Sequence, residues 1–446
     1  MQWRFALIDS AQHSIDLQYY VWFGDSLGKL MMFKVIQAAD RGVKVRILFD
    51  DLSTMLHDMT HIELRDALLA RVDRHPNIEI RVFNAWQDRS LIGRLFDTAA
   101  DFQRLNRRMH NKQMIVDNRA AIIGGRNLGD EYFGLNPEFN FHDMDVLGVG
   151  PVARQASQVF DRYWNSDWVR GIPKQTLSTP VADTDELSSN ALKALLSHPS
   201  LQMINASHSN WHSHLAELPT LLAVGTSQVH TDSPARDMDV RNHMPEAFRA
   251  LMRSARQEVL ITNAYIIPDN NFMNDLRELA GRGVKVSILT NSLSSHDVPA
   301  VNSHYQQWRK PILQTGANLH ELRSDAAMQS EIVDLAPLRA EFVGLHTKAM
   351  VIDRERSFIG SMNLDPRSEV INSEMGVIID SRALAQKLTE RMLRDMTAAN
   401  SWQVTIQPDG NLLWVSSAGE RTGQPARNFW QRVEDVVFKL FPSTMY

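Results

Sequence analysis

One pattern of residue types occurs twice in the chain and carries groups that could do chemistry. Both copies read His-x-Lys-x4-Asp-x6-Gly-x2-Asn, and neither needs a gap. The fixed residues are His110, Lys112, Asp117, Gly124 and Asn127 in the first copy and His346, Lys348, Asp353, Gly360 and Asn363 in the second. At about one in twenty per position, five fixed types arise by chance about once in a few million starting positions. Two copies therefore indicate a duplicated functional unit.

The residue types in each copy suit the handling of a phosphate group. The residues after each His alternate between polar and apolar, which predicts a strand on which His and Lys point to the same face. A neutral imidazole is a nucleophile or a base near pH 7, and a Lys ammonium is a point charge suited to a phosphate oxygen. An Asn amide can donate to the same oxygens.

Covalent catalysis on a phosphodiester needs two such units, because one His attacks and the other protonates the leaving oxygen. We therefore expect the two copies to form one site. A single His-x-Lys would more often be a solvated strand edge, and the duplication argues against that interpretation. A metal site is disfavoured because the chain has no Cys and each motif His neighbours a Lys instead of a second ligand.

The pattern resembles the paired motifs of the phospholipase D superfamily. The resemblance implies a covalent phospho-histidine intermediate, with His110 as the nucleophile and His346 as the acid and then the base. It further implies that Lys112, Lys348, Asn127 and Asn363 hold the phosphate and that no metal or cofactor is needed. Asp117 and Asp353 belong to the catalytic motifs, but we expect them to orient the motif and not to touch substrate.

The superfamily also has a carboxylate that hydrogen-bonds the far nitrogen of each catalytic His. By position in the chain, the resemblance assigns this role to Asp145 and Glu374. The physical need is that a carboxylate fixes the imidazole tautomer and stabilises the imidazolium when it forms.

Composition is that of a folded protein of two or three domains. The chain has 446 residues, of which 43% are hydrophobic and 22% are charged, and its net charge is −5. This charge gives no global attraction to nucleic acid. No apolar run approaches 18 residues, and we expect neither a transmembrane helix nor a signal peptide. A lack of Cys fits a reducing compartment.

Strands and helices alternate in the first half, which predicts an α/β fold with mixed sheets flanked by helices. The pattern then repeats: Arg282-Gly283-Val284-Lys285-Val286 matches Arg41-Gly42-Val43-Lys44-Val45, as His346 matches His110. This predicts two similar lobes related by a pseudo-twofold axis, with the active site between them. The expected domains are a first lobe at 1–175, a connection at 176–235, a second lobe at 236–400 and a C-terminal hairpin with an amphipathic helix at 401–446.

The expected elements follow from these patterns. Helices are predicted at 2–14, 27–40, 60–71, 151–166, 185–197, 243–255, 270–281, 298–314 and 381–398. Strands are predicted at 14–22, 43–49, 78–83, 113–116, 120–124, 143–149, 257–263, 284–289 and 318–321, and a hairpin at 402–415. The loop Asn263-Ala264-Tyr265-Ile266-Ile267-Pro268 lies where the first half has Leu17-Gln18-Tyr19-Tyr20-Val21-Trp22. An aromatic from each stretch could line the site, and packing of each Tyr in the core is at least as consistent with the sequence.

Longer stretches narrow the resemblance to bacterial cardiolipin synthases of the C type. They include Gly124-Gly125-Arg126-Asn127-Leu128-Gly129-Asp130 and Gly360-Ser361-Met362-Asn363-Leu364-Asp365-Pro366-Arg367-Ser368. The resemblance implies transfer of a phosphatidyl group from phosphatidylethanolamine or phosphatidylglycerol to phosphatidylglycerol, by a peripheral protein on the cytoplasmic face of the inner membrane. A hydrolytic phospholipase D is the alternative, and a nuclease of the same superfamily is a weaker one.

Two segments could meet a membrane. Residues 84–108 contain Arg89, Arg94, Arg104, Arg107 and Arg108, which would form either a solvated basic loop or a rim for anionic headgroups. At the C-terminal end, Phe429, Val433, Val436, Val437, Leu440 and Phe441 share one helical face. That face could dock on the core, which we favour from the sequence, or insert in the plane of a membrane interface.

Overall fold

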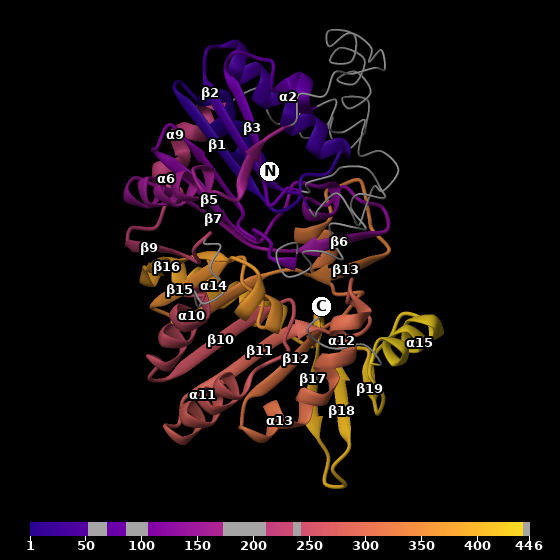
Figure 1. The fold of residues 1–446 in the computed structure, drawn as a ribbon. Helices are drawn as coiled ribbons and strands as arrows, with labels where there is room; N and C mark the ends of the chain where they lie inside the picture. The colour runs from indigo at the N-terminus through magenta and orange to yellow at the C-terminus, as the bar shows by residue number, and fades with distance from the viewer. Residues whose placement is uncertain (52–68, 86–105, 173–210, 235–241, 440–446) are drawn as a thin grey trace.

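The protein folds into two lobes stacked one on the other, which Figure 1 shows as the indigo-to-magenta half above the orange-to-yellow half. The computed structural model describes residues 1–51, 69–85, 106–172, 211–234 and 242–439. Several expectations lie outside these residues: the helix at 185–197, most of the helix at 60–71, most of the basic segment at 84–108, and the apolar positions Leu440 and Phe441.

The first lobe is a seven-stranded mixed sheet with helices on its faces, in the strand order β7-β5-β4-β1-β2-β3-β8. Its strands are β1 (Ser14–Tyr19), β2 (Lys44–Asp50), β3 (Ile78–Phe83), β4 (Gln113–Val116), β5 (Ala120–Gly124), β7 (Asp145–Val149) and β8 (Val169–Gly171). Its helices are α1 (Gln2–Ser10), α2 (Ser26–Asp40), η2 (Asp130–Tyr132) and α6 (Pro151–Trp164). β1, β2 and β3 run parallel, and the remaining pairs are antiparallel.

The second lobe repeats this sheet and extends it to ten strands, in the order β19-β18-β17-β12-β11-β10-β14-β15-β16-β9. Its strands are β9 (Thr226–Thr231), β10 (Glu258–Asn263), β11 (Lys285–Asn291), β12 (Asn318–Leu322), β14 (Lys348–Ile352), β15 (Arg356–Gly360), β16 (Met375–Asp380), β17 (Ser401–Ile406), β18 (Leu412–Ser416) and β19 (Gly419–Arg421). Its helices are α10 (Met244–Arg253), α11 (Asn270–Gly281), α12 (Pro299–Tyr305), η3 (Gln306–Trp308), α13 (Arg309–Gln314), η4 (Gln329–Val333), η5 (Arg367–Ile371) and α14 (Arg382–Asp395). Two further helices, α9 (Trp211–Leu221) and α15 (Phe429–Phe438), lie outside this repeat.

The predicted α/β fold and the duplication are confirmed. The order β16-β15-β14-β10-β11-β12-β17 in the second sheet mirrors β7-β5-β4-β1-β2-β3-β8 in the first. In both lobes the motif strand, β4 or β14, lies antiparallel to the strand that begins the parallel set. The strand at 78–83 and the helix at 270–281 have the predicted bounds.

Some expected boundaries are wrong for identifiable reasons. β9 pairs with β16, so residues 226–231 belong to the second sheet and not to a connection. The hairpin of β17 and β18 joins β12, so it extends the same sheet and is not a separate unit. The helix expected at 298–314 is interrupted between α12 and α13, because Pro311 lacks the N–H that would continue the helical hydrogen bonds through Gln307.

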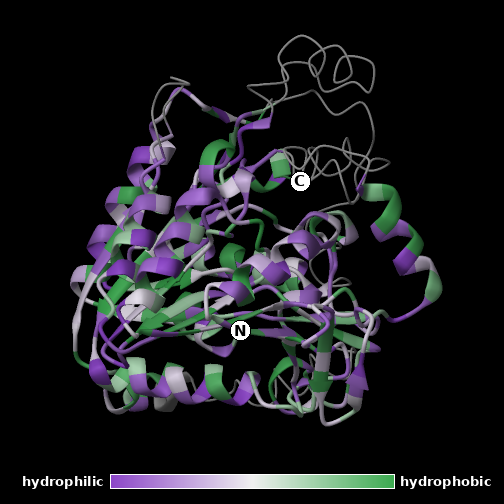
Figure 2. Cartoon of the chain, turned by 90° about the horizontal axis from the view of Figure 1, so that it is seen from below, coloured by the Kyte–Doolittle hydropathy of each residue, from purple (hydrophilic) through white to green (hydrophobic). Residues whose placement is uncertain are grey.

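Apolar packing and a shared sheet join the lobes. A cluster in the first lobe includes Ile115 and Ile123 and continues into Met375, Val377 and Ile379 of the second. β13 (Phe342–Leu345) pairs in parallel with β6 (Phe139–His142), so each lobe gives one strand to a two-stranded sheet. Figure 2 shows the largely green strands inside, with helices around them that alternate between green and purple. Both short strands lead directly into residues of the candidate site.

Candidate active site

The two motif histidines lie where the lobes meet, and each is held by the backbone of the opposite lobe. His110 donates its backbone N–H to the Ser373 carbonyl at 2.8 Å, and His346 donates its own to the His142 carbonyl at 2.9 Å. Both imidazoles are nearly buried, with 9% and 7% of the side-chain surface exposed. Each lobe therefore positions the histidine of the other lobe through a hydrogen bond to its backbone N–H.

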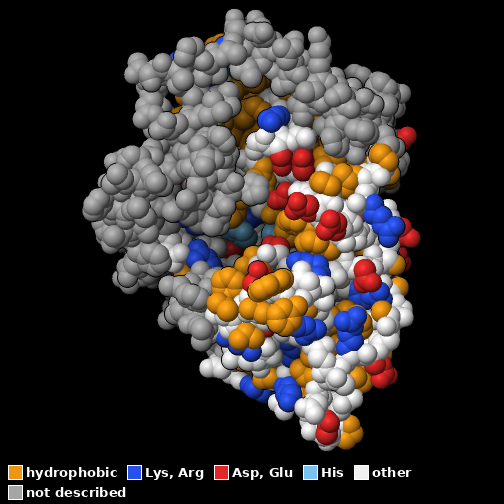
Figure 3. All heavy atoms as spheres, turned by 90° about the vertical axis from the view of Figure 1, so that its right-hand side faces the viewer, with side chains coloured by type: hydrophobic (Ala, Val, Ile, Leu, Met, Phe, Trp, Pro, Cys, Tyr) orange, Lys and Arg blue, Asp and Glu red, His pale blue; other side chains and the backbone are white. Residues whose placement is uncertain are grey.

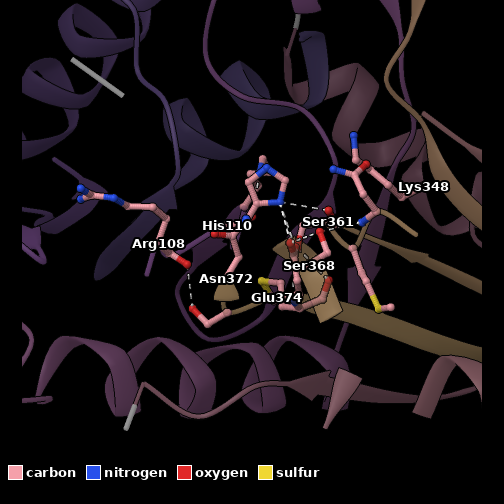
Figure 4. A network of polar contacts seen from close by, with 12 residues as sticks. Arg108, His110, Lys348, Ser361, Ser368, Asn372 and Glu374 are labelled. Carbon is pink, nitrogen blue, oxygen red and sulfur yellow. Dashed lines mark hydrogen bonds and ion pairs between the residues drawn. The ribbon is translucent and has the colours of Figure 1, made fainter. Parts of the chain in front are cut away.

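Each His side chain is also paired with a carboxylate from the opposite lobe. Nδ1 of His110 lies 2.9 and 3.0 Å from the Glu374 oxygens, and Nδ1 of His346 lies 2.6 Å from Asp143 Oδ2. Figure 4 shows Glu374 beneath His110, joined to its ring by dashed lines. With Nδ1 occupied on both rings, Nε2 is the nitrogen left to react with a substrate.

The contact expected for Glu374 is confirmed, but the assignment of Asp145 is wrong. The Asp145 carboxylate pairs with Arg4 at 3.0 Å and with Arg126 at 3.1 Å, away from the His346 ring. Sheet register explains the error, because Gly124 pairs with Asp145 while Gly360 pairs with Gly376.

Asp143 is therefore the structural counterpart of Glu374. A signal in the sequence could have found it, since Asp143-Met144 and Glu374-Met375 are the same acidic-then-Met pair. The number of residues between the motif Gly and the carboxylate differs between the lobes, so counting positions along the chain gave the wrong Asp.

The surroundings of the two carboxylates differ. Glu374 accepts hydrogen bonds from Ser361 Oγ at 2.5 Å and Ser368 Oγ at 2.8 Å, and both hydroxyls appear beside it in Figure 4. The position equivalent to Ser361 is Gly125, where an added Cβ would lie 2.5 Å from Asp143 Oδ1. The shorter Asp reaches its His only because this glycine leaves room for it. Sequence reasoning did not single out Ser361 or Ser368 for this role.

Both motif lysines are buried beside the histidines. Lys112 and Lys348 are each 1% exposed, and each Nζ donates to the carbonyl of its own motif His, at 2.7 and 2.5 Å. Burial lowers the pKa of Lys112 well below its usual value, and it lowers the pKa of Lys348 to about 8. A bound anion would favour the charged form of both amines.

Burial and neighbouring charges favour the neutral form of His110. Burial, followed by the charges of Lys112 and Lys348, lowers the pKa of His110 well below 6.5. Burial and Lys348 also lower the pKa of His346, while the neighbouring Asp143 acts in the opposite direction. Burial raises the pKa of Glu374 to about 7. His110 is therefore a free base near neutral pH, as a nucleophile must be.

The motif aspartates lie at the far ends of their strands from the histidines. Asp117 accepts from the backbone N–H groups of residues 12–14 at 2.7–2.9 Å, and Asp353 accepts from those of residues 256–258 at 2.8–2.9 Å. They fasten the beginning of β1 and β10 to the motif strand. This fits the expected orienting role, and it places neither carboxylate at the reacting atoms.

The motif asparagines are buried, and their side chains are used unequally. Asn127 accepts from Val21 N–H at 3.2 Å and donates to the Tyr132 hydroxyl at 2.9 Å. Among the described residues, Asn363 Oδ1 has no hydrogen-bond partner. A phosphate contact from either amide remains a prediction.

Aromatic rings surround both histidines. Tyr20 meets His110 edge-on with ring centroids 4.9 Å apart, and Tyr265 lies 6.5 Å from His346. The Tyr20 and Tyr265 rings lie 5.1 and 5.8 Å from the ammonium groups of Lys112 and Lys348. Of the two readings of these tyrosines, the structure supports lining of the site. Tyr132, 5.1 Å from His346, adds a ring that the sequence did not indicate.

Arg108 is not part of a basic rim. It is 1% exposed, and its guanidinium pairs with Asp50 at 3.3 Å. A buried Arg held in this way packs the segment that leads into His110.

Comparison with known proteins agrees with this geometry. A family model described as "Cardiolipin synthase, PLD-like domain" matches residues 5–164 and 248–396, which contain both motifs. Cardiolipin synthase C of Escherichia coli K12 is 35% identical over 98% of this chain and 92% of its own length. Cardiolipin synthase B of the same strain is 25% identical over 97% of this chain and 83% of its own length.

Among solved structures, a phosphatidylserine synthase from Haemophilus influenzae superposes with a TM-score of 0.58 at 13% identity, covering 88% of this chain and 84% of that one. At this identity the likeness concerns the fold alone, and it agrees with the two-lobed architecture. With the family model matching most of the chain and a relative similar over nearly its full length, the chain belongs to the family of cardiolipin synthases with phospholipase D-like domains.

Proposed function

We propose that the protein is a cardiolipin synthase that transfers a phosphatidyl group through a covalent phosphatidyl-histidine. The observation that carries the proposal is the pair of crossed His–carboxylate contacts, His110 with Glu374 and His346 with Asp143. Two imidazoles with Nδ1 fixed and Nε2 free meet the needs of a double displacement at phosphorus. Family membership supports the choice of a phospholipid as substrate.

In the first step, Nε2 of His110 attacks the phosphorus of the donor lipid, phosphatidylglycerol or phosphatidylethanolamine. The bond from phosphorus to the headgroup oxygen breaks, and His346 gives that oxygen a proton. His110 suits the attack because its pKa is held well below 6.5 by burial and the lysine charges. Lys112, Lys348, Asn127 and Asn363 would hold the phosphate oxygens.

In the second step, His346 takes the proton of a phosphatidylglycerol hydroxyl, whose oxygen attacks phosphorus. The bond to His110 breaks and cardiolipin is formed. Asp143 would stabilise the imidazolium form of His346, which donates the proton in the first step and is restored in the second. Water at about 55 M competes with this alcohol, so exclusion of water and orientation of the acceptor must favour the lipid by several kcal/mol.

We place the protein at the cytoplasmic face of the inner membrane, as a peripheral protein. Among the described residues, no helix is long and apolar enough to cross a membrane. The lipid substrates proposed here require contact with a bilayer all the same.

Thin-layer chromatography of labelled phosphatidylglycerol, incubated with the purified protein, tests the proposal. Cardiolipin is the expected product, and a higher rate with added phosphatidylethanolamine would identify that lipid as the donor. Phosphatidic acid alone would mean that water accepts the phosphatidyl group and that the protein is a hydrolytic phospholipase D. With the label in the phosphate group, protein quenched in denaturing detergent at mildly alkaline pH, where a bond between phosphorus and His survives, should carry the label on the peptide that contains His110. An unlabelled protein under these conditions would overturn the covalent step.

A further inference from the structure

The helix α15 docks on the protein through its polar side. Gln431 and Asp435 are its buried residues, with 3% and 2% exposed. Asp435 accepts from Asn302 at 2.6 Å and from Gln306 at 3.1 Å, both on or just after α12. Gln431 donates to the carbonyl of Leu293. An amphipathic helix of a globular protein normally buries its apolar stripe, so this orientation is the reverse of the usual one.

Consequently, the apolar face of α15 points away from the protein. Phe429 and Trp430 are 71% and 70% exposed, and Val436 and Val437 are 62% and 46% exposed. At about 100° per residue, this face lies opposite the docked side. Exposed Arg432 flanks it. Single exposed apolar residues are common on protein surfaces. Four of them on one face of a short helix form a contiguous apolar patch, which marks an interaction site.

The patch lies beside a surface hollow that contains histidine side chains. Figure 3 shows orange side chains gathered over α15, next to a hollow in which pale-blue histidines are visible. The same helix lies at the right-hand edge of Figures 1 and 2. Its apolar face and this hollow therefore face the same side of the molecule.

Contacts also connect α15 with the site. Arg427, just before the helix, donates to the carbonyl of Ser294. The loop that contains Ser294 continues to His296, whose ring stacks on Tyr265 with centroids 5.3 Å apart, and to Asp297, which accepts from the Tyr265 hydroxyl at 2.6 Å. Tyr265 in turn meets His346. Anchoring α15 would thus fix the loop that supports one half of the site.

We propose that α15 lies in the plane of a bilayer interface, with Phe429, Trp430, Val436 and Val437 among the acyl chains, and so presents the active site to lipid headgroups. This inference rests on the proposed function and names the surface that delivers its substrate. A lipid surface fits better than a second copy of the chain, because exposed Arg432 and Lys439 outnumber the exposed Glu434 on this helix and suit anionic headgroups.

The absence of Cys from the chain allows a direct test. A single Val436→Cys variant of the full-length protein would carry an environment-sensitive fluorophore, and Val224→Cys, at a position 94% exposed, is the matched control. With vesicles of phosphatidylcholine and phosphatidylglycerol, the label at 436 should shift to the blue and be quenched by spin-labelled lipid. The label at 224 should do neither. An unchanged label at 436 would overturn the proposal, and so would a blue shift without vesicles accompanied by a dimer in light scattering.

A second test separates this inference from the proposed activity. The Trp430→Asp, Val436→Asp double variant should float with vesicles about tenfold less than wild type, whereas Leu221→Asp, Val224→Asp should float normally. On a short-chain phosphatidylglycerol below its micelle concentration, the first variant should keep wild-type turnover. Equal flotation of the two variants would overturn the membrane role. The wild type could also float with vesicles but convert neither vesicle phosphatidylglycerol nor the short-chain lipid. That result would overturn the proposed function and leave the membrane role of α15 supported.

Discussion

The two halves of the active site perform the same task with different parts. His110 is paired with a Glu that two hydroxyls hold, from Ser361 and Ser368. His346 is paired with an Asp that packs against Gly125. The longer acid needs partners to fix its extra rotatable bond, whereas the shorter acid needs the backbone to come close. Duplication thus preserved the His–carboxylate contact while each half acquired its own means of support.

Replacement of the histidines should have the largest effect and separate their roles. His110→Ala and His346→Ala should each lower phosphatidyl transfer by roughly 10⁴-fold or more. With a phosphodiester whose leaving group is p-nitrophenol, protonation matters less, so His346→Ala should still release a burst of one p-nitrophenolate per protein. His110→Ala should give no burst. A burst from His110→Ala, with folding verified by circular dichroism, would reverse the assignment.

Neutralising the two carboxylates should have the next largest effect. Glu374→Gln and Asp143→Asn keep the size of each side chain but remove its preference for one imidazole tautomer, and should lower turnover about 10²- to 10⁴-fold. Asp145→Asn is the matched control, because Asp145 contacts Arg4 and Arg126 and no motif His. If Asp145→Asn lowers turnover as much as Asp143→Asn with an unchanged melting temperature, the pairing described here is wrong.

An exchange at the supporting positions should show how different the halves are. Gly125→Ser places a Cβ 2.5 Å from Asp143, so that carboxylate must move; we expect a cost of about 1–3 kcal/mol in stability and lower turnover. Ser361→Gly removes one hydrogen bond while Ser368 still holds Glu374, so turnover should fall less. The melting temperature and the turnover of both variants should be measured together. A larger loss in Ser361→Gly than in Gly125→Ser would contradict this prediction.

The motif aspartates, in contrast, should behave alike. Asp117→Ala and Asp353→Ala each remove the acceptor of three backbone N–H groups from a residue with a positive φ, of 52° and 51°. We expect each to lower stability by about 1–3 kcal/mol, seen as a lower melting temperature, with turnover within about tenfold of wild type near 20 °C. A specific loss of turnover at full stability would show that one of them acts in the chemistry.

A pH dependence of stability should also come from Glu374. Burial raises the pKa of this carboxyl from 4.5 to about 7, so the folded state binds its proton more tightly than the unfolded state does. Its contribution is complete below pH 4.5 and is lost as pH rises through 7. The melting temperature of wild type relative to Glu374→Gln should therefore fall between pH 4.5 and 7. A constant difference would contradict the raised pKa.

Much of the architecture followed from local patterns, because each motif strand and its neighbours carry their own periodicity. The carboxylate partner of His346 could not be predicted from such local patterns. It depends on sheet register, and the segments between the motif Gly and the acid differ in length between the lobes, which led to Asp145 in place of Asp143. Each acid comes from the opposite lobe. This pairing depends on how the two folded lobes face each other, and the residue pattern of a strand carries no information about that.

The orientation of α15 could not be read from its periodicity either. The pattern of Phe429, Val433 and Val436 is the same whether that face meets a core or a membrane, and core docking was the favoured interpretation. The structure instead buries Gln431 and Asp435. Their partners, Leu293 and Asn302, lie more than 130 residues away in the chain, so no local signal announces the contact.

The crossed carboxylates have a consequence for synthesis of the protein. Glu374 lies 264 residues after His110, and His346 follows Asp143 by 203 residues. At roughly 5–20 residues per second, a ribosome adds the acid partner of His110 some 13–50 s after that histidine. A nascent or truncated chain that has folded only its first lobe therefore carries neither His–carboxylate pair, and reactivity toward lipid begins only when the second lobe is nearly complete.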